Sequence, residues 1–280
     1  MNIEKTITKG TKLLKNSNIK NPYLDSELLL SKVIKKDRKY MILNSKKKLN
    51  SKYLENFNNL ISRRKRGEPV AYLINSKEFW KQKYFVNKHV LIPRPDSEIL
   101  VEETLKLYQK RKKIKLLDIG TGSGCLLLSI LKERRNFFGT GVDISKNAVN
   151  IAQFNAKSQK LNNRVKFYIS DIDKFLIGKY DLILSNPPYI KKLDIKYLDN
   201  DIAFYEPKVA LDGGSDGFSE ITKVINKASE LIKRNGKFIL EIGYNQKNET
   251  INKLINKKFY INKVVKDYGE NDRCIISTKI

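Results

Sequence analysis

The stretch LLDIGTGSGCLLLSIL, residues 116–131, places a glycine-rich turn between a short apolar segment and a longer one. The short segment has the length of a buried strand, and the longer one is typical of a helix. Gly120, Gly122 and Gly124 allow the backbone to turn sharply and to approach a ligand closely. This order of strand, glycine turn and helix predicts the start of a doubly wound α/β sheet.

Further apolar runs alternate with helix-like segments after Pro95 and extend this prediction. Five of them lie at residues 114–117, 139–142, 165–169, 182–184 and 238–242. Their alternation favours a mostly parallel sheet with helices on both faces. Two last runs, 260–265 and 274–277, are joined by KDYGENDR, which is too short for a crossover helix. We therefore expect these two strands to pair antiparallel at one edge of a seven-stranded sheet.

The first part of the chain has a different pattern. From Ile3 to Ile74 apolar residues recur at helical spacing, as in Leu24, Leu28, Leu29 and Val33. Asn21-Pro22 and Ser51 fit helix starts, and Gly67-Glu68-Pro69 fits a helix end. Residues 77–92 alternate apolar with polar side chains, which predicts a β-hairpin. We expect a helical domain over 1–75, a hairpin connector over 76–95 and an α/β domain over 96–280.

The chain is strongly basic, with 56 Lys and Arg residues against 30 Asp and Glu residues. Residues 1–88 carry 22 of the basic and 7 of the acidic residues, so the excess is greatest near the N-terminus. Lysines are scattered along the whole chain, which is also what a general compositional bias produces. Such a surface favours an acidic or RNA-bearing partner electrostatically. Direct contact with nucleic acid is compatible with this charge but is not required by it.

Only two cysteines occur, Cys125 and Cys274, both in apolar stretches. This argues against a disulfide framework and against a thiolate metal site, and it favours buried thiols in a reducing compartment. No apolar run reaches the ~18 residues that a membrane span requires. We expect a soluble, cytoplasmic, monomeric protein without a metal.

Two acids follow the next predicted strands. Asp143 in GTGVDIS can accept both hydroxyls of a ribose, whether the ligand is NAD or S-adenosylmethionine, and Asp171 in YISDID can face an adenine amino group. Each acid taken alone fits a turn or helix cap equally well. The glycine spacing, Gly-x-Gly-x-Gly, differs from the Gly-x-Gly-x-x-Gly of dinucleotide folds.

The motif SNPPYI, residues 185–190, ends the fourth predicted strand. Pro187 and Pro188 cannot donate to a sheet ladder, so they stop the strand at the edge where the glycine turn lies. The side-chain oxygen of Asn186 and the carbonyl of Pro187 can together accept both hydrogens of a planar NH2 group. Tyr189 can supply a flat face for that group. Such a pocket suits a weakly nucleophilic nitrogen, either an amide or an aromatic amine.

Taken together, VLIPRPDSEILV, DIGTGSG, GVDIS, SNPPYI and YEPKVALDGGSDGF resemble, in order and spacing, the peptide chain release factor glutamine methyltransferases of the HemK/PrmC family. The resemblance covers about Gly67 to Arg273. It implies a seven-stranded, Rossmann-like class I methyltransferase sheet with an N-terminal helical bundle and a hairpin connector. It further implies methyl transfer from S-adenosylmethionine to the glutamine side-chain amide nitrogen of the Gly-Gly-Gln motif in release factors.

The resemblance also implies roles for individual residues. Cofactor binding falls to Gly120, Thr121, Gly122, Ser123, Gly124, Asp143, Asp171, Ile172 and Asn186. Substrate binding falls to Asn186, Pro187, Pro188 and Tyr189, of which Asn186, Pro187 and Tyr189 are the expected catalytic residues. Members of the family often carry an aromatic residue where this chain has Ile172, and Glu-Thr where it has Asp96-Ser97. The single histidine, His89, is expected to be structural or exposed.

Three other interpretations remain open on the sequence alone. Enzymes that methylate the N6 amine of adenine in DNA or RNA use a similar Asn- or Asp-Pro-Pro-aromatic pocket, but this chain has no large target-recognition segment after Tyr189. A nicotinamide oxidoreductase fits the glycine turn and Asp143 but gives the Asn-Pro-Pro-Tyr motif no role. A non-catalytic RNA-binding protein fits the basic N-terminal helices but not two intact motifs.

Overall fold

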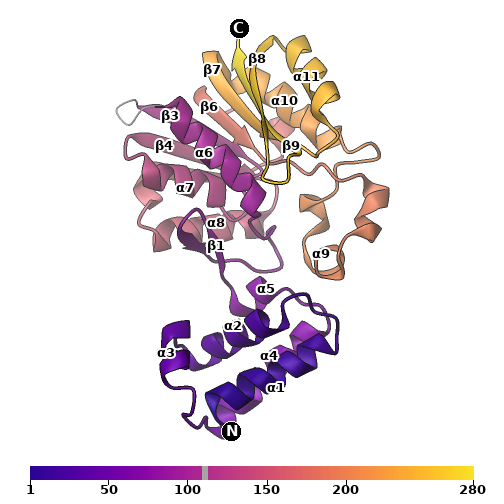
Figure 1. The fold of residues 1–280 in the computed structure, drawn as a ribbon. Helices are drawn as coiled ribbons and strands as arrows, with labels where there is room; N and C mark the ends of the chain where they lie inside the picture. Colours follow the sequence, from indigo (N-terminus) through magenta and orange to yellow (C-terminus); the bar gives the residue numbers. More distant parts are fainter. Residues whose placement is uncertain (109–112) are drawn as a thin grey trace. The chain divides into compact units, whose positions relative to one another are not determined.

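The computed structural model describes residues 1–108 and 113–280, coloured along the chain in Figure 1. These residues form two compact units. One unit comprises residues 1–76 together with 199–205, and the other comprises the remaining described residues from 77 to 198 and from 206 to 280. The segment 199–205 lies inside the predicted α/β domain, yet its contacts group it with the N-terminal unit.

The N-terminal unit is helical. Its helices are α1 (Ile3–Lys15), α2 (Pro22–Ile34), α3 (Arg38–Leu43), α4 (Ser51–Lys65), α5 (Val70–Ile74) and α9 (Asn200–Tyr205). Side-chain oxygens of Asn2, Asp37 and Asn50 accept backbone N–H groups at the starts of α1, α3 and α4, which satisfies donors that no helical carbonyl can reach. The predicted helix starts at Pro22 and Ser51 are confirmed.

The core of this unit lies between α1, α2 and α4. Its most buried apolar side chains include Leu14, Leu29, Leu30, Phe57 and Ile61. The predicted apolar face of α2 is wrong at one position, because Leu24 is 47% exposed. The first turn of α2 instead faces inward through Asp25, whose Oδ2 lies 2.7 Å from Nε of the buried Arg64 on α4.

The segment 199–205 is attached to the N-terminal helices by polar contacts. The Tyr205 hydroxyl donates to the Arg66 carbonyl oxygen at 2.8 Å, and Lys20 Nζ lies 2.6 Å from Asp199 Oδ2. A sequence pattern does not reveal such contacts, because the partners are more than 130 residues apart.

The predicted hairpin is present but shorter than the predicted range. Strands β1 (Lys77–Phe79) and β2 (Gln82–Tyr84) pair antiparallel. Trp80 and Lys81 connect them with positive φ angles of 44° and 63°, as a two-residue turn with the twist of a hairpin requires. From Phe85 onward no strand continues, and side-chain acceptors replace the ladder, as when Asn155 Oδ1 accepts Phe85 N at 2.8 Å.

The second unit contains the seven-stranded sheet. Its strands are β3 (Ile114–Ile119), β4 (Phe137–Asp143), β5 (Val165–Ile169), β6 (Tyr180–Ser185), β7 (Ile232–Glu241), β8 (Phe259–Lys266) and β9 (Asp272–Lys279). Their order is β5-β4-β3-β6-β7-β9-β8. Strands β3 to β7 pair in parallel, and β9 pairs antiparallel with both β7 and β8. The predicted parallel sheet with an antiparallel edge pair is therefore confirmed.

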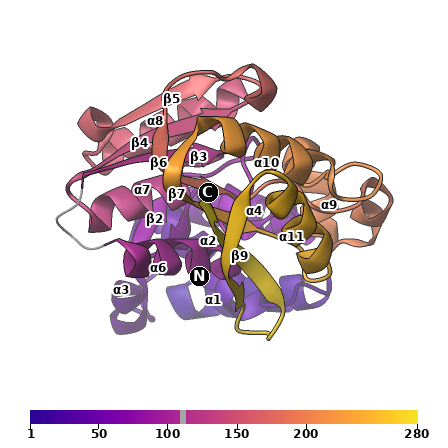
Figure 2. The same cartoon turned by 90° about the horizontal axis from the view of Figure 1, so that it is seen from above.

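Helices cover both faces of this sheet and can be followed in Figures 1 and 2. They are α6 (Glu98–Leu107), α7 (Cys125–Glu133), α8 (Lys146–Ser158), α10 (Ser219–Leu231) and α11 (Lys247–Asn256). Successive side chains of β3 point to opposite faces, so Leu116 packs with α6 and α7 while Leu117 packs with α10. Burial on both faces explains why the central strands are continuous apolar runs.

The sheet brings the ends of its parallel strands to one edge. Ile119 at the end of β3 pairs with both Ser185 of β6 and Val142 of β4, and Asp143 pairs with Ile169 of β5. The glycine turn, the two acids and the Asn-Pro-Pro-Tyr motif lie at these strand ends or within two residues of them. Parallel pairing therefore gathers motifs from four separate parts of the sequence.

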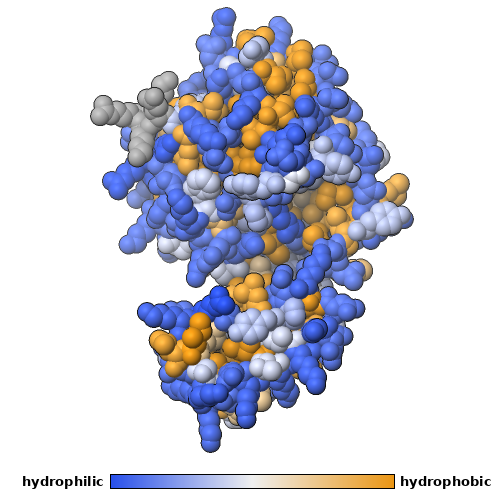
Figure 3. All heavy atoms as spheres, in the orientation of Figure 1, coloured by the Kyte–Doolittle hydropathy of each residue, from blue (hydrophilic) through white to orange (hydrophobic). Residues whose placement is uncertain are grey.

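On the face drawn in Figure 3, hydrophilic side chains cover most of the molecule, with smaller hydrophobic patches among them. None of the helices in residues 1–108 and 113–280 has the length and apolar character needed to cross a membrane. Cys274 is buried and Cys125 half-buried, and neither forms a disulfide. Burial raises the pKa of the Cys125 thiol to about 12, which disfavours the reactive thiolate.

Candidate active site

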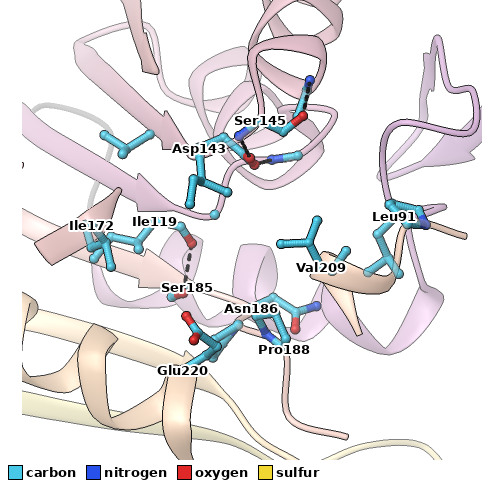
Figure 4. A pocket seen from close by; sticks show the side chains of 18 of the residues that line it. Leu91, Ile119, Asp143, Ser145, Ile172, Ser185, Asn186, Pro188, Val209 and Glu220 are labelled. Carbon is cyan, nitrogen blue, oxygen red and sulfur yellow. Dashed lines mark hydrogen bonds between the residues drawn. The ribbon is translucent and has the colours of Figure 1, made fainter. Parts of the chain in front are cut away.

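A cavity of about 480 Å³ lies at the carboxyl edge of the parallel strands. This volume is within the range of small-molecule sites in proteins, about 300–1,000 Å³. Figure 4 shows Asp143 and Ser145 on one side of it and Asn186 and Pro188 on the other. The cavity is where ligands of open α/β sheets bind, outside the carboxyl ends of the strands.

The glycine turn forms part of the cavity wall through Gly120 and Gly122. Backbone N–H groups of Gly120 and Thr121 donate to the Val142 carbonyl oxygen at 2.9 and 3.0 Å, which holds the turn against the end of β4. Gly120 has φ of +74°, and a Cβ at this position would meet no atom within 4 Å. The backbone thus faces open space that a ligand can fill.

Three predicted cofactor residues of the turn, Thr121, Ser123 and Gly124, do not line the cavity. Thr121 Oγ1 donates to Asp118 Oδ2 at 2.7 Å, and the Ser123 carbonyl oxygen accepts Asn155 Nδ2 at 2.9 Å. Gly124 begins α7 with φ of +80°, where a Cβ would lie 3.1 Å from Leu128 Cδ1. These residues shape the turn.

Asp118 is fully buried at the end of β3, beneath the turn. Burial raises its pKa to about 7; the hydrogen bond from Thr121 opposes this rise and the nearby charge of Asp143 adds to it. Asp118 therefore orients the turn from inside the protein.

Asp143, the last residue of β4, lies on the cavity wall. Its Oδ2 accepts Gly122 N and its Oδ1 accepts Ser145 N, both at 2.9 Å. Burial raises the pKa of this carboxyl, against the effect of these two bonds. Each oxygen keeps a second lone pair. The carboxylate is thus rigidly held and still able to accept two ligand hydroxyls.

Asp171 and Ile172 also line the cavity. Asp171 Oδ1 accepts Asp173 N at 3.1 Å, so this acid is a cap of the short 3-10 helix Ile172–Lys174 as well as a wall residue. Ile172 packs against the apolar core beneath α10 and presents an aliphatic surface. A planar ring can lie on this surface but cannot form an aromatic stack with it.

Asn186 is held at the cavity by hydrogen bonds around it. Ser185 Oγ donates to the Ile119 carbonyl oxygen at 2.8 Å and ties the end of β6 to β3, as the dashed line in Figure 4 shows. Asn186 Nδ2 donates to Ser97 Oγ at 3.0 Å, which leaves Oδ1 as the group available to a ligand. Pro187 and Pro188 line the cavity beside it.

Tyr189 lies outside the cavity wall. Its hydroxyl donates to Glu241 Oε1 and accepts Nη1 of Arg273, each at 3.4 Å. Burial is the largest cause of the raised pKa of this phenol. The structure places the ring among the residues that support the motif, and a role in stacking on the substrate stays a prediction.

The chain is similar to known proteins over its whole length. A family model described as the PrmC N-terminal domain matches residues 5–74, and one described as a methyltransferase domain matches residues 110–275. A release factor glutamine methyltransferase of Buchnera aphidicola subsp. Acyrthosiphon pisum is 39% identical over 100% of this chain and 99% of its own length. A release factor glutamine methyltransferase of Clostridium acetobutylicum is 34% identical over 100% of this chain and 99% of its own length.

The chain belongs to the release factor glutamine methyltransferase family. It is therefore an S-adenosylmethionine-dependent methyltransferase. Among solved structures, a methyltransferase from Pyrococcus furiosus matches with a TM-score of 0.53 at 20% identity, over 70% of this chain and 88% of that one, which supports the class I methyltransferase fold.

The cavity of this methyltransferase fits its cofactor. Gly120 and Gly122 leave room for close approach, Asp143 has acceptors of the kind that ribose hydroxyls need, and Ile172 has an apolar surface of the kind that suits a planar base. Acidic side chains in the wall also suit a ligand that carries a positive sulfonium. In the part of the chain that the structure describes, no cluster of three or more His, Cys, Asp and Glu side chains is arranged to hold a metal.

Sequence reasoning missed several wall residues of the methyltransferase. His89, Val90 and Leu91 line the cavity from the loop after β2, where the alternating pattern had predicted a longer hairpin. His89 also contacts Asn147, with 3.4 Å between Nδ1 and Nδ2. Ser97, which hydrogen-bonds Asn186, belongs to the motif VLIPRPDSEILV, and this motif is the sequence signal for this part of the site.

Proposed function

We propose that this enzyme transfers a methyl group from S-adenosylmethionine to the side-chain amide nitrogen of the glutamine in the Gly-Gly-Gln motif of peptide chain release factors. The names of its full-length relatives support release factors as the substrate class. The observation that carries the choice of an amide nitrogen is the bond from Asn186 Nδ2 to Ser97, because it leaves an acceptor at the cavity.

A planar NH2 group needs two acceptors that lie near its plane. Asn186 Oδ1 supplies one, and the carbonyl of Pro187, next along the chain and also in the cavity wall, supplies the other. The reaction requires the nitrogen to lie in line with the carbon–sulfur bond that breaks. Holding it in this orientation lowers the activation barrier by several kcal/mol, about 7–11 kcal/mol in the best cases.

When bound, S-adenosylmethionine supplies the electrophilic methyl carbon. Positive charge develops on the amide nitrogen as it reacts, and the two oxygens stabilise this charge as preorganised acceptors. The methylated amide cation is acidic enough to lose its proton to water, so no strong base is required. The one histidine in the cavity wall, His89, comes from the loop after the hairpin, and the proposed reaction does not need it as a base.

For the cofactor we propose that Gly120, Gly122, Asp143, Asp171 and Ile172 make the direct contacts. Thr121, Ser123 and Gly124 act through the shape of the turn. Asn186, Pro187 and Pro188 bind the glutamine, and Tyr189 supports them.

We further propose that the basic N-terminal helical unit docks the release factor, which would place the enzyme in the cytoplasm with its substrate, and that it acts as a monomer. The domain ranges 1–75, 76–95 and 96–280 remain the working division for testing these roles.

The experiment is a transfer assay with radiolabelled S-adenosylmethionine. Its acceptors are a purified release factor, the same factor with its Gly-Gly-Gln glutamine changed to alanine, duplex DNA and RNA. Label on the intact factor alone supports the proposal. Label on nucleic acid would contradict it and would assign the same pocket to the N6 amine of adenine. Label on neither would refute both substrate classes.

A further inference from the structure

Ser97 is a buried polar residue that touches the catalytic asparagine. It ends the 3-10 helix Pro95–Ser97, just before α6, and is 3% exposed. Its Oγ accepts Asn186 Nδ2 at 3.0 Å, although the two residues are 89 positions apart in the chain. Since the family resemblance assigns Ser97 no role, this contact needs its own explanation.

Glu241, at the end of β7, lies behind both ends of the Asn-Pro-Pro-Tyr motif. It is 1% exposed, and its Oε1 accepts the Tyr189 hydroxyl at 3.4 Å. The Ser97 hydroxyl is close enough to lower the pKa of this carboxyl, although Oε2 has no partner with full hydrogen-bond geometry among the described residues. Tyr189 therefore links Glu241 to one end of the motif by a hydrogen bond, and Ser97, which bonds Asn186 at the other end, lies near the same carboxyl.

The direction of these hydrogen bonds decides what Asn186 offers to a ligand. An ionised carboxylate only accepts, so a proton shared between Ser97 and Glu241 can come only from the Ser97 hydroxyl. Ser97 Oγ can then only accept from Asn186, which turns Nδ2 toward Ser97 and Oδ1 away from it. With Ser97 removed or Glu241 protonated, the amide is free to flip and present Nδ2, a donor, to the incoming NH2 group.

We propose that Ser97 and Glu241 are positioning residues that set the polarity of the hydrogen bonds behind Asn186, so that Asn186 presents an acceptor to the nitrogen that is methylated. This inference rests on the proposed function, because it requires that the group that receives the methyl is an NH2 group. It adds two residues to the reaction that touch neither the methyl group nor its acceptor.

The surroundings of Glu241 make its charge state sensitive to pH. Burial raises its pKa to about 7, against the effect of Ser97 and Arg273. The groups that face it are Ser97 and Asp96 before α6, Tyr189 after β6, Arg273 and Cys274 on β9, and Cys125 at the start of α7. Of these, Arg273 favours the ionised carboxylate and Asp96 opposes it.

The first test compares Ser97→Ala, Ser97→Thr and the matched control Ser129→Ala in the full-length enzyme with the release factor. Ser129 is also buried, its hydroxyl hydrogen-bonds to Tyr84 at 2.7 Å, and neither of these two residues lines the cavity. We expect Ser97→Ala to lower kcat roughly 10- to 100-fold, less than the ~100- to 1,000-fold typical of a direct transition-state contact. KM for S-adenosylmethionine should stay unchanged, and Ser97→Thr should recover kcat to within about threefold.

Three results would overturn the role of Ser97. They are a kcat for Ser97→Ala equal to that of Ser129→Ala, a failure of threonine to restore kcat, or a loss expressed mainly as a higher KM for S-adenosylmethionine. Melting temperatures of all variants show whether a loss of kcat is only a loss of folded protein. If Ser97→Ala does not fold, Ser97→Thr and Glu241→Gln still decide the question.

A double-mutant cycle with Asn186→Asp tests the polarity itself. Aspartate has two acceptor oxygens, so it cannot be flipped into the wrong orientation. In the Asn186→Asp background, Ser97→Ala should therefore change the residual kcat by less than about threefold, whereas independent effects would multiply. Equal losses in both backgrounds would contradict the proposal.

Glu241→Gln supplies the final test through the pH dependence of kcat. The wild type should gain activity with a midpoint near pH 7 as Glu241 ionises, and Glu241→Gln should be slow and lack this rise. A rise that persists in Glu241→Gln would assign it to another group, such as Asp118, and would refute the role of Glu241. If the wild type labels no release factor, the proposed substrate itself is refuted. If the wild type labels the factor but the variants behave otherwise than expected, only the polarity argument is refuted.

Discussion

At the scale of single residues, Asn186 separates catalysis from cofactor binding. Asn186→Ala removes one acceptor for the reacting nitrogen, whereas the glycine turn and Asp143 are held by bonds of their own. We expect kcat to fall ~100- to 1,000-fold, with a change of less than about threefold in the Kd for S-adenosylmethionine. Calorimetry and single-turnover kinetics measure the two quantities. An equal loss in both would mean that Asn186 mainly binds the cofactor.

Asp118 gives a prediction about stability. Its pKa rises from an ordinary value of 3.8 to about 7 in the folded protein. The unfolded chain therefore ionises first as pH increases, and the wild type should lose stability between about pH 4 and 7, by on the order of a few kcal/mol. Asp118→Asn lacks this loss, because its side chain is always neutral.

Urea unfolding of the wild type and Asp118→Asn from pH 4 to 8 measures this difference. The difference in free energy of unfolding should grow in favour of Asp118→Asn up to about pH 7 and then level off. The exposed Asp194→Asn, which also removes one carboxylate, is the control for the change in net charge. A constant difference across the range would show that Asp118 does not titrate in this way.

At the scale of elements, the close approach of α1 to its neighbours depends on Gly10. A Cβ there would lie 2.4 Å from Ser26 Oγ and 2.7 Å from Phe57 Cζ. Alanine in a helix normally adds up to about 1 kcal/mol of stability over glycine, but overpacking a core costs about 1–3 kcal/mol. We expect Gly10→Ala to be destabilising overall, as measured by urea unfolding.

The control for this prediction is Lys12→Ala, an exposed change two residues further along α1. It should alter the free energy of unfolding by no more than about 0.5 kcal/mol. A Gly10→Ala variant more stable than the wild type would show that α1 can move away from α2 and α4 at little cost.

At the scale of the whole molecule, the charge distribution predicts how the release factor binds. Residues 1–88 carry 22 basic and 7 acidic side chains, so attraction to an acidic factor should weaken as salt screens it. We expect the Kd for the factor to rise at least about tenfold between 50 and 500 mM salt, mainly through slower association. Stopped-flow or biolayer binding measures this, and an affinity unmoved by salt would contradict it.

A matched pair of charge reversals locates the effect. Lys5→Glu with Lys9→Glu changes α1, and Lys257→Glu with Lys258→Glu makes the same change in net charge between α11 and β8. All four lysines are exposed. The first pair should weaken factor binding more than the second. Equal effects would show that only the total charge matters.

Much of the architecture was available from local sequence patterns. The apolar runs are continuous where strands are buried on both faces, and the link KDYGENDR is too short for anything but an antiparallel turn, so the strands and the edge pair were predictable. The placing of Gly120 and Asn186 at the edge where the cavity lies was also predictable, because glycine spacing and paired prolines have local conformational causes.

Tertiary structure alone decided the contacts between residues distant in sequence. The bond between Ser97 and Asn186, the position of Glu241 behind Tyr189, and the wall formed by His89 to Leu91 all depend on how separate segments fold together. The grouping of residues 199–205 with the N-terminal helices is of the same kind. Periodicity and motif spacing describe a residue's own neighbours along the chain, whereas these contacts arise from the packing of side chains that no local pattern relates.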